Sequence, residues 1–447
     1  MSKRILIVGG VGGGATVASQ IRRKDKEATI ILFEKGDEIA FSNCGMPYYI
    51  GDVVESRDKL LVSTDGFSKK YDVDVRLQSK VIDIERHNKA IHIQNTQQTY
   101  TETYDKLILA PGATPIRPDM EGMQPTNTFT LRTIPDMDRI QSYIDKEKPT
   151  SAAVIGAGFI GMEMVENLRA IGIECTLINR SDQVMNIVDK DMAAMIQEEL
   201  ENNGVHVLLN DGVESFSHNG KVLHLHSGQT VEAEMTILAV GIQPNTSLAK
   251  KASLKLGIKE TIAVNAFMQT NDEDIYALGD AVEIRDFQNG APRHIALAGP
   301  AHRQAYVIAS HLSGESVSYN GSIGASILKV FDLTIAASGN TSRTLKEMND
   351  PFEETILHGY EHAGYYPGSQ KLTLKILFNA TSGIIYSAQV VGYGGVDKRH
   401  AVLATAMKGN MTIYHLAELE LAYAPPYSSP KDPINILGYK AIAQLEG

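Results

Sequence analysis

One stretch of the chain decides the fold: residues 4–34 read RILIVGGVGGGATVASQIRRKDKEATIILFE. An apolar run at 4–8, typical of a buried parallel strand, enters a glycine-rich turn and then a helical stretch to about Lys24. A second apolar run, 29–33, ends in an acid. Glycines let the backbone approach a pyrophosphate, a helix start attracts its charge, and the acid binds ribose hydroxyls. The order predicts a dinucleotide-binding unit, with a plain structural turn as the alternative. Its expected cofactor contacts are Gly9, Gly13, Gly14 and Glu34.

The same pattern recurs at 152–163, which read AAVIGAGFIGME. Here the motif G-x-G-x-x-G is complete, whereas the first turn has Val11 in place of the middle glycine. The strand expected at 174–178 ends in a neutral residue and an arginine instead of an acid. An acid would repel the 2′-phosphate of NADP, so this ending favours NADPH over NADH, unless the arginine is a solvated loop charge. The expected contacts are Gly156, Gly158, Gly161, Asn179 and Arg180.

Two dinucleotide sites in one chain indicate two redox cofactors that exchange a hydride. Two further segments suit a flavin: YDKLILAPGATP at 104–115 is a strand running into a turn, and IYALGDA at 275–281 is a strand followed by Gly-Asp. In this order, the motifs resemble the two-dinucleotide-domain flavoprotein disulfide reductases. That resemblance implies FAD, with a carboxylate on its ribityl chain. The flavin contacts it adds are Ala110, Gly112, Gly279 and Asp280.

The chain has two cysteines, whereas the best-known members of that group carry a C-x₄-C pair beside the flavin. Cys175 lies in an apolar strand and is expected in the core. Cys44 follows Ser42 and Asn43, which are good helix caps, so we expect it near a helix start, where the pKa of a thiol is lowered. Without a resolving cysteine, its oxidised form is a sulfenic acid or a mixed disulfide with a small thiol. Cys44 is therefore the predicted nucleophile.

Single-cysteine members of the group include NADH oxidases and peroxidases, coenzyme A-disulfide reductases, and persulfide or polysulfide reductases. The oxidases and peroxidases carry a histidine in the first glycine turn, where this chain has Gly12. Three other motifs are similar to the coenzyme A-disulfide reductases: QIRRK at 20–24, HAGYYPG at 362–368 and AYAPPYSSPKD at 422–432. This resemblance covers essentially the whole chain.

The resemblance implies a set of coenzyme A contacts. The binding residues it gives are Thr16, Gln20, Arg23, Asn43, Lys70, His302 and Lys431. Two points are open: Ala40 stands where better-known members have a serine, and the register of the contact near Lys70 and Tyr71 is not fixed. The basic cluster Arg22, Arg23, Lys24 and Lys26 also suits the phosphates of coenzyme A, because arginine grips phosphate bidentately. Its alternative reading is a charged helix end favoured by the helix dipole.

The resemblance also implies a homodimer in which Tyr365 and Tyr423 reach Cys44 of the other subunit. Attack on a disulfide expels a thiolate, which a phenol can hydrogen-bond or protonate. Without the resemblance, aromatic clusters of this kind are usually read as core. These two tyrosines join Cys44 as the predicted catalytic residues.

Composition bounds the class of protein. The 447 residues carry 42 Lys+Arg and 53 Asp+Glu, a net charge of −11, which argues against nucleic acid or an anionic membrane as partner. We expect no transmembrane helix and no signal peptide, and the cysteine usage fits a reducing cytoplasm. No metal site is expected, because HExxH and paired CxxC motifs are absent from the sequence.

The predicted fold is α/β, with two Rossmann-like dinucleotide-binding domains and a C-terminal α/β dimerisation domain. The expected segments are 1–112 and 245–322 for FAD, 113–244 for NAD(P), and 323–447 for dimerisation, with a hairpin around the turn 379–383. The predicted enzyme passes electrons from NADPH, with NADH as the open alternative, through FAD and Cys44 to coenzyme A disulfide. A coenzyme A mixed disulfide on Cys44 is the expected intermediate. Alternatives are a coenzyme A persulfide or polysulfide reductase, an NADH oxidase, and a non-enzymatic flavin-binding thiol redox sensor.

Overall fold

The computed structural model describes residues 2–446, which form two compact units. Unit 1 holds the residues up to 116 together with 131–142 and 241–322. Unit 2 holds 117–130, 143–240 and the residues from 323 on. Each unit contains a five-stranded parallel sheet flanked by helices, so the predicted α/β fold is confirmed. The domain boundaries predicted from the sequence stay a prediction.

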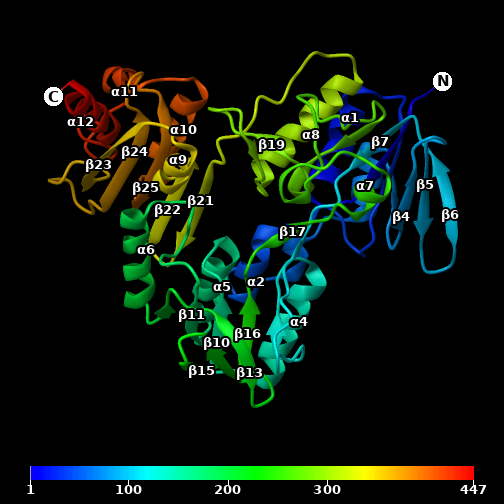
Figure 1. The fold of residues 1–447 in the computed structure, drawn as a ribbon, viewed down its shortest axis with the longest axis horizontal. Helices are drawn as coiled ribbons and strands as arrows, with labels where there is room; N and C mark the ends of the chain where they lie inside the picture. The colour runs from blue at the N-terminus through cyan, green and yellow to red at the C-terminus, as the bar shows by residue number, and fades with distance from the viewer. Residues whose placement is uncertain (1, 447) are drawn as a thin grey trace. The chain divides into compact units, whose positions relative to one another are not determined.

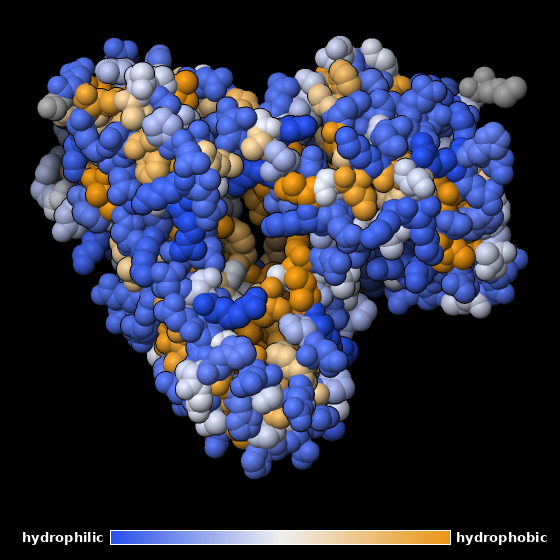
Figure 2. Space-filling model, viewed as in Figure 1, coloured by the Kyte–Doolittle hydropathy of each residue, from blue (hydrophilic) through white to orange (hydrophobic). Residues whose placement is uncertain are grey.

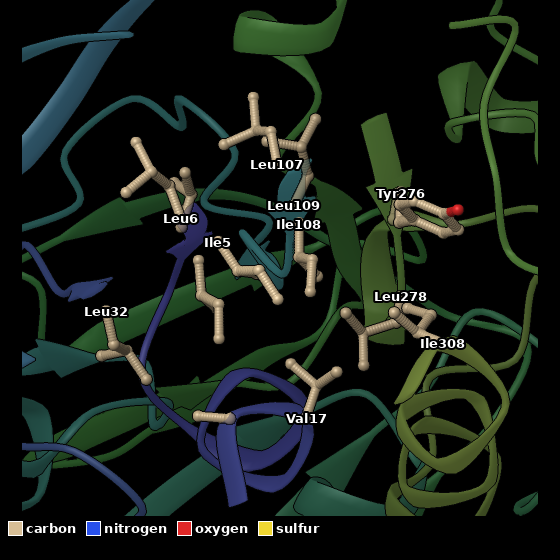
Figure 3. Packing of buried hydrophobic residues seen from close by; sticks show 14 of the residues in the cluster. Ile5, Leu6, Val17, Leu32, Leu107, Ile108, Leu109, Tyr276, Leu278 and Ile308 are labelled. Atoms are coloured by element: carbon tan, nitrogen blue, oxygen red, sulfur yellow. The ribbon is translucent and has the colours of Figure 1, made fainter. Parts of the chain in front are cut away.

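A parallel sheet in the order β18-β7-β1-β2-β3 forms the centre of unit 1 (Figure 1). Its strands are β1 (Arg4–Val8), β2 (Thr29–Phe33), β3 (Asp74–Arg76), β7 (Lys106–Leu109) and β18 (Ile275–Ala277). Helices α1 (Gly12–Lys24) and α8 (Ala298–Leu312) pack against each other and cover the sheet. Figure 3 shows Val17 and Ile308 from these helices beside the strand residues Ile5 and Ile108. The inner strands β1, β2 and β7 read as nearly continuous apolar runs because the sheet is covered on both faces, whereas the edge strand β3 is polar.

Smaller elements complete unit 1. The antiparallel sheet β4-β5-β6 and two short ribbons, β8 with β17 and β19 with β20, surround the parallel sheet. Their bounds are β4 (Lys80–Glu85), β5 (Ala90–Gln94), β6 (Thr99–Thr103), β8 (Ala113–Pro115), β17 (Ile242–Pro244), β19 (Ile284–Arg285) and β20 (Pro292–Arg293). The remaining helices are η1 (Asn43–Gly45), α2 (Met46–Ile50), η2 (Arg57–Leu60), α3 (Thr64–Tyr71), α7 (Ser247–Lys251), η3 (Ile258–Glu260) and η4 (Gly279–Ala281), and α4 (Ile134–Glu147) spans the boundary between the units.

The parallel sheet of unit 2 has the order β12-β11-β10-β16-β9, with a three-stranded antiparallel sheet β13-β14-β15 beside it. The strands are β9 (Thr128–Phe129), β10 (Ser151–Ile155), β11 (Glu174–Ile178), β12 (His206–Leu208), β13 (Val213–Ser217), β14 (Val222–Leu225), β15 (Thr230–Glu232) and β16 (Met235–Leu238). The helices are α5 (Phe159–Ala170) and α6 (Lys190–Asn202). One apolar cluster joins the two sheets, with Ile155 and Ile178 packed among Phe216 and Leu223.

A five-stranded antiparallel sheet in the order β21-β22-β25-β24-β23 forms the C-terminal part of unit 2. Its elements are β21 (Ser326–Val330), β22 (Leu333–Gly339), α9 (Ser342–Met348), β23 (Phe352–Tyr360), β24 (Lys371–Asn379), β25 (Ile385–Gly392), α10 (Val396–Lys408), α11 (Ile413–Glu418) and α12 (Pro433–Glu446). The predicted hairpin is confirmed, because β24 and β25 pair antiparallel around the turn. The Asn379 side-chain oxygen accepts bonds from the backbone N–H groups of Thr381 and Ser382, at 2.9 and 2.7 Å.

The surface is mainly polar. Figure 2 shows a face on which hydrophilic residues predominate and hydrophobic residues form scattered patches. Within residues 2–446, no helix is long and apolar enough to cross a membrane. The same described residues contain no cluster of three or more His, Cys, Asp or Glu side chains arranged to hold a metal ion.

The first glycine turn depends on a close approach of two backbones. Gly9 has a φ of +99°, and a side chain there would overlap the carbonyl oxygen of Ala110 at the end of β7. A side chain on Gly14 would overlap the carbonyl oxygen of Gly9. Val11 departs from the motif without strain, because its φ of −86° is open to any residue.

The second turn repeats this arrangement in unit 2. Gly156 has a φ of +106°, and a side chain there would overlap the carbonyl oxygen of Ala239. A side chain on Gly161 would overlap the carbonyl oxygen of Gly156. Gly158, which corresponds to Val11, has a φ of −92° and no atom within 4 Å of an added Cβ. Only two of the three motif glycines are therefore required by the packing of the fold.

This difference predicts unequal effects of two alanine substitutions. Gly161→Ala forces α5 away from β10 and should destabilise the protein by about 2 kcal/mol, seen as a Tm lower by about 5 °C. The matched control Gly158→Ala fills open space and should leave the Tm of the cofactor-free protein unchanged. Differential scanning calorimetry of both variants checks this, and equal melting temperatures would contradict the steric argument.

Candidate active site

Cys44 lies in η1, the short 3₁₀ turn that precedes α2, and its side chain is exposed. The predicted helix cap is wrong: Ser42 makes no side-chain cap bond, and the Asn43 amide donates to the Arg132 carbonyl at 3.0 Å. The turn is closed by the backbone, because the Gly45 N–H donates to the Ser42 carbonyl at 3.0 Å. The Ser42 N–H donates to the Leu60 carbonyl at 2.9 Å, so Ser42 and Asn43 together fix the turn that carries Cys44 to the rest of unit 1.

The second cysteine is excluded from chemistry by burial. Cys175 in β11 is 3% exposed, and desolvation raises the pKa of its thiol to about 12. A thiol with this pKa stays protonated at neutral pH and is a poor nucleophile. Of the chain's two cysteines, only Cys44 is accessible, as the sequence predicted.

Glu34 lies at the end of β2, where the sequence placed the ribose-binding acid. It is 8% exposed, and its two carboxylate oxygens accept bonds from the N–H groups of Gly10, at 2.7 Å, and Gly36, at 2.9 Å. Each oxygen keeps a further lone pair for a hydroxyl. The predicted contact Gly13 lies in the first turn of α1, where an added Cβ would be 3.1 Å from Leu278. A buried acid next to a helix whose first turn consists of glycines is the arrangement expected of a dinucleotide-binding site.

Asp280 lies in η4, directly after Gly279 at the end of β18. Its carboxylate forms an ion pair with the Arg132 guanidinium at 2.6 Å. Arg132 also accepts the Asn43 bond through its carbonyl, so it connects the cysteine turn to the predicted flavin carboxylate. Arg132 could not be predicted from the sequence, because 89 residues separate it from Asn43 and 148 from Asp280, and no local pattern marks it.

The other predicted flavin contacts lie at the carboxyl end of the same sheet. Ala110 and Gly112 follow β7, and Gly112 has a φ of +66°. The Gly279 N–H donates to the Gln304 side chain at 2.8 Å, which ties η4 to α8. These positions surround one strand end with backbone and small residues, the arrangement that dinucleotides use in parallel sheets.

Asn179 takes the place in unit 2 that Glu34 takes in unit 1. Its side-chain oxygen accepts a bond from the Ala157 N–H at 3.3 Å, and its amide donates to the Gln183 carbonyl at 2.8 Å. The adjacent Arg180 is exposed, with its stem against Gly212. The site therefore has a neutral side chain where an acid would select NAD, and a cation next to it.

A cavity of about 550 Å³ opens beside α1 and α3. Its lining residues are Ala15, Thr16, Ser19, Ala40, Val62, Ser63, Gly66, Phe67, Lys70 and Tyr71. Two predicted coenzyme A contacts, Thr16 and Lys70, are thus brought together from segments far apart in the sequence. Ala40 faces the same cavity, so the missing serine removes one hydroxyl from its wall.

Two cations lie close to the ring of Tyr71, which lines this cavity. Its ring centroid lies 5.1 Å from the Lys70 ammonium and 5.8 Å from the Arg23 guanidinium. Hydrogen bonding from Lys70, supported by Arg23, lowers the pKa of the Tyr71 phenol. The sequence pointed to a contact near Lys70 and Tyr71, but it did not predict that the Tyr71 ring lies next to both Lys70 and Arg23. A ring flanked by two cations suits a phosphorylated ligand.

The predicted basic cluster is divided by the fold. Arg22 is 8% exposed, and its guanidinium donates to the carbonyls of Lys26, Ala28 and Asp72 at 2.7–2.8 Å. The prediction that Arg22 faces phosphate is therefore wrong, because its donors close a loop. Lys24 pairs with Glu315 at 2.6 Å. Arg23 stays exposed.

The remaining predicted contacts are spread over both units. Gln20 is half-buried one turn after Thr16 on α1, and His302 is exposed on α8. Lys431 belongs to unit 2, where its ammonium lies 5.8 Å from the Tyr439 ring centroid. Its participation in the same site as Thr16 stays a prediction.

Tyr365 and Tyr423 meet in unit 2, although 58 residues separate them in the sequence. Their hydroxyl oxygens are 3.4 Å apart, and the side chains are 76% and 43% exposed. Their mutual hydrogen bond raises the pKa of Tyr423. The reading as ordinary core aromatics is therefore wrong, and the two phenols form a pair at the surface.

The chain is similar over nearly its full length to several known reductases. Coenzyme A disulfide reductase of Staphylococcus epidermidis is 41% identical over 443 residues, which cover 98% of this chain and 99% of that protein. The crystal structure of reduced Bacillus anthracis CoADR-RHD is 48% identical with a TM-score of 0.98, covering 100% of this chain and 81% of that one. An NAD-dependent persulfide reductase from A. fulgidus is 34% identical with a TM-score of 0.97, covering 99% of this chain and 84% of that one.

Two family models match the chain. The pyridine nucleotide-disulphide oxidoreductase model matches residues 3–305, and its dimerisation-domain model matches residues 325–432. The first match spans both glycine turns and Cys44, and the second includes Tyr365 and Tyr423. The chain therefore belongs to the pyridine nucleotide-disulphide oxidoreductases, a family whose members use FAD and a pyridine nucleotide.

Proposed function

We propose that this protein is a coenzyme A disulfide reductase, in which electrons pass from NADPH through FAD and Cys44 to coenzyme A disulfide. The observation that carries the proposal is that the Cys44 thiol is accessible, whereas the Cys175 thiol is buried and protonated. With no second reachable cysteine, the oxidised form of Cys44 is a sulfenic acid or a mixed disulfide, and we assign the mixed disulfide with coenzyme A. The relatives named coenzyme A disulfide reductase, matched over nearly the full length, support this choice of thiol.

The chain's own residues fit both cofactors. Glu34, Asp280 and the first glycine turn would hold FAD, and Asn179, Arg180 and the second turn would hold NADPH. FAD supplies a two-electron carrier between the nicotinamide and sulfur. Arg180 is the residue we assign to the 2′-phosphate, because a guanidinium pairs with phosphate and the adjacent side chain is neutral.

Cys44 performs the sulfur chemistry. Its thiolate attacks one sulfur of coenzyme A disulfide, so that a Cys44–coenzyme A bond forms, the substrate S–S bond breaks and one coenzyme A leaves as a thiolate. Two electrons then break the mixed disulfide, restoring the Cys44 thiolate and releasing the second coenzyme A. In total, NADPH and one proton convert one disulfide into NADP⁺ and two thiols.

The substrate is held by its phosphates. Arg23 and Lys70, gathered by Tyr71, would pair with the anionic part of coenzyme A, and Thr16 lines the same cavity. Gln20, Asn43, His302 and Lys431 complete the proposed binding set. In the homodimer that we propose, the phenol pair Tyr365 and Tyr423 hydrogen-bonds the leaving thiolate of the site containing Cys44 of the other subunit.

A coenzyme A persulfide reductase is the second candidate, favoured by the likeness to the persulfide reductase structure. The same Cys44 and cavity would serve it. An NADH oxidase is less favoured, because Gly12 leaves no imidazole in the first turn. A redox sensor would form a Cys44 adduct without turnover. Steady-state kinetics with coenzyme A disulfide, coenzyme A persulfide and oxygen separates these functions.

Cys44→Ser should give a folded, FAD-containing protein whose coenzyme A disulfide reductase rate is lower by about a thousandfold, because the proposed nucleophile is gone. Cys175→Ala is the matched control and should keep the wild-type rate. Intact mass spectrometry of the wild type should find a coenzyme A adduct that Cys44→Ser lacks. Substantial turnover by Cys44→Ser would sink the assigned role.

Arg23→Met and Arg22→Met should separate binding from folding. Arg23→Met should weaken coenzyme A disulfide by about one to two decades in KM, through one lost charge-assisted bond, and leave the Tm unchanged. Arg22→Met should lower the Tm, because buried carbonyls lose their donors. A small disulfide without phosphates is the control substrate, and equal losses on both substrates would show that Arg23 does not hold phosphate.

Arg180→Ala should raise the KM for NADPH by about tenfold, the value of one charge-assisted phosphate contact. The KM for NADH should not change, since NADH lacks the 2′-phosphate, and it serves as the internal control. If the wild-type enzyme prefers NADH, or if both values rise together, the assignment of Arg180 is wrong.

A further inference from the structure

Arg399 on α10 is the largest of the fully buried side chains in the described residues, with 1% exposure. A guanidinium cannot lose its proton in a protein, so its charge must be met by acceptors. It lies in the C-terminal part of unit 2, and none of the chemistry proposed above uses it. Its partners therefore indicate what it is for.

The partners come from two separate segments. One terminal nitrogen donates to the Glu361 carbonyl at 2.6 Å and to the Asp432 carboxylate at 3.1 Å. The Tyr427 carbonyl and the Ser428 hydroxyl lie at 3.3 and 3.4 Å from the same nitrogen. Arg399 thus joins residues 361–367 to residues 423–432, the two segments that carry the phenol pair.

In the first segment, a short turn connects the Glu361 carbonyl, which Arg399 binds, to Tyr365. The His362 ring pairs with the Glu361 carboxylate on one side and contacts the Tyr366 carbonyl at 3.3 Å on the other. The Tyr366 N–H donates to the Ala363 carbonyl at 2.9 Å. Tyr365 therefore sits at the tip of a turn whose base is the carbonyl that Arg399 binds.

The second segment is built in the same way. The Ala424 carbonyl accepts bonds from the N–H groups of Tyr427, at 2.9 Å, and Ser428, at 3.2 Å, which closes the turn after Tyr423. The Ser428 hydroxyl donates to the Asp432 carboxylate at 2.7 Å. Arg399 contacts the far side of this turn, so both tyrosines rest on supports that meet at one guanidinium.

The chain leaves room for that guanidinium. Gly395, directly before α10, has a φ of +63°, and a Cβ there would overlap a terminal nitrogen of Arg399. The residue before the helix is therefore restricted to glycine by the position of the arginine. The sequence next to Arg399 is thus compatible with the position of its guanidinium, which indicates a specific role for this buried charge.

We propose that Arg399 is a positioning residue that sets the distance between the hydroxyls of Tyr365 and Tyr423. The proposal rests on the proposed function, in which this pair stabilises the leaving thiolate. The tyrosines are exposed and their hydroxyls are 3.4 Å apart, so their separation depends on the backbone turns that carry them. Arg399 is the one group that contacts both turns among the bonds described.

Arg399→Lys tests the proposal, because lysine keeps the charge but its side chain is too short to place its nitrogen where one Arg399 nitrogen meets both the Glu361 carbonyl and the Asp432 carboxylate. We expect kcat for coenzyme A disulfide to fall about tenfold, with KM unchanged, since hydrogen-bond assistance to the leaving thiolate is lost while binding is kept. In a Tyr423→Phe background, the same substitution should have an effect of less than about twofold, because the pair is already broken.

Lys375→Arg is the matched control. Lys375 is a second buried cation of this unit, 4% exposed and paired with Asp189, Asp191 and Glu354, and it does not contact either tyrosine segment. Hydrogen exchange followed by mass spectrometry should be faster in 361–367 and 423–428 for Arg399→Lys than for the wild type or Lys375→Arg. The Tyr423 titration, followed by ultraviolet difference absorbance against Tyr423→Phe, should move toward the ordinary tyrosine value.

Three results would overturn the proposal: an unchanged kcat for Arg399→Lys, an equal loss with and without Tyr423, or unchanged exchange in both segments. If the wild type does not turn over coenzyme A disulfide, the proposed function fails by itself. The exchange and titration measurements then still decide whether Arg399 holds the pair.

Discussion

The structure of both nucleotide-binding units depends on one contact, in which a glycine turn packs against the carbonyl that follows the neighbouring strand. Gly9 against Ala110, and Gly156 against Ala239, bring each helix start to the carboxyl edge of its sheet. The rest of each site follows from it. Glu34 is fixed by a bond from the turn to its carboxylate, and Asn179 by the same bond to its amide oxygen. One steric requirement thus places the helix dipole, the strand ends and the side chain that follows the second strand of each unit.

Much of this could be predicted from the sequence, because it is local. The strands around both turns, the acid after β2 and the C-terminal hairpin depend on patterns a few residues long. The errors concern groups whose partners are distant. Ser42 was expected to cap a helix, but the turn there is closed by backbone and held through Arg132, far along the chain. Likewise, the basic residues at the end of α1 predicted a cationic site, but the sequence did not show that Arg22 is buried and Arg23 exposed.

Arg22 and Arg399 show why an arginine count says little about ligands. Both are buried: Arg22 donates to backbone carbonyls of loop residues, whereas Arg399 donates to a backbone carbonyl and to the Asp432 carboxylate. Arg22 bonds carbonyls through all the nitrogens of its guanidinium fork, which a point charge could not do. Within the proposed function, exposed arginines such as Arg23 and Arg180 would give their donors to phosphate. In an acidic protein with a net charge of −11, the separation of the two kinds decides where an anionic substrate can bind.

The phenol pair also limits how the leaving group can depart. A thiol has a pKa of about 8.5 and a tyrosine one of about 10, so complete proton transfer from phenol to thiolate is unfavourable near neutral pH. The bond between Tyr365 and Tyr423 raises the pKa of Tyr423 and makes the transfer less favourable still. Within the proposed function, the pair therefore acts as a hydrogen-bond donor to a departing thiolate and keeps its own proton. Such a donor works only at the correct distance, because a hydrogen bond weakens steeply with misalignment. Exposed phenols that perform this task need rigid support from below, and the buried guanidinium beneath them supplies it.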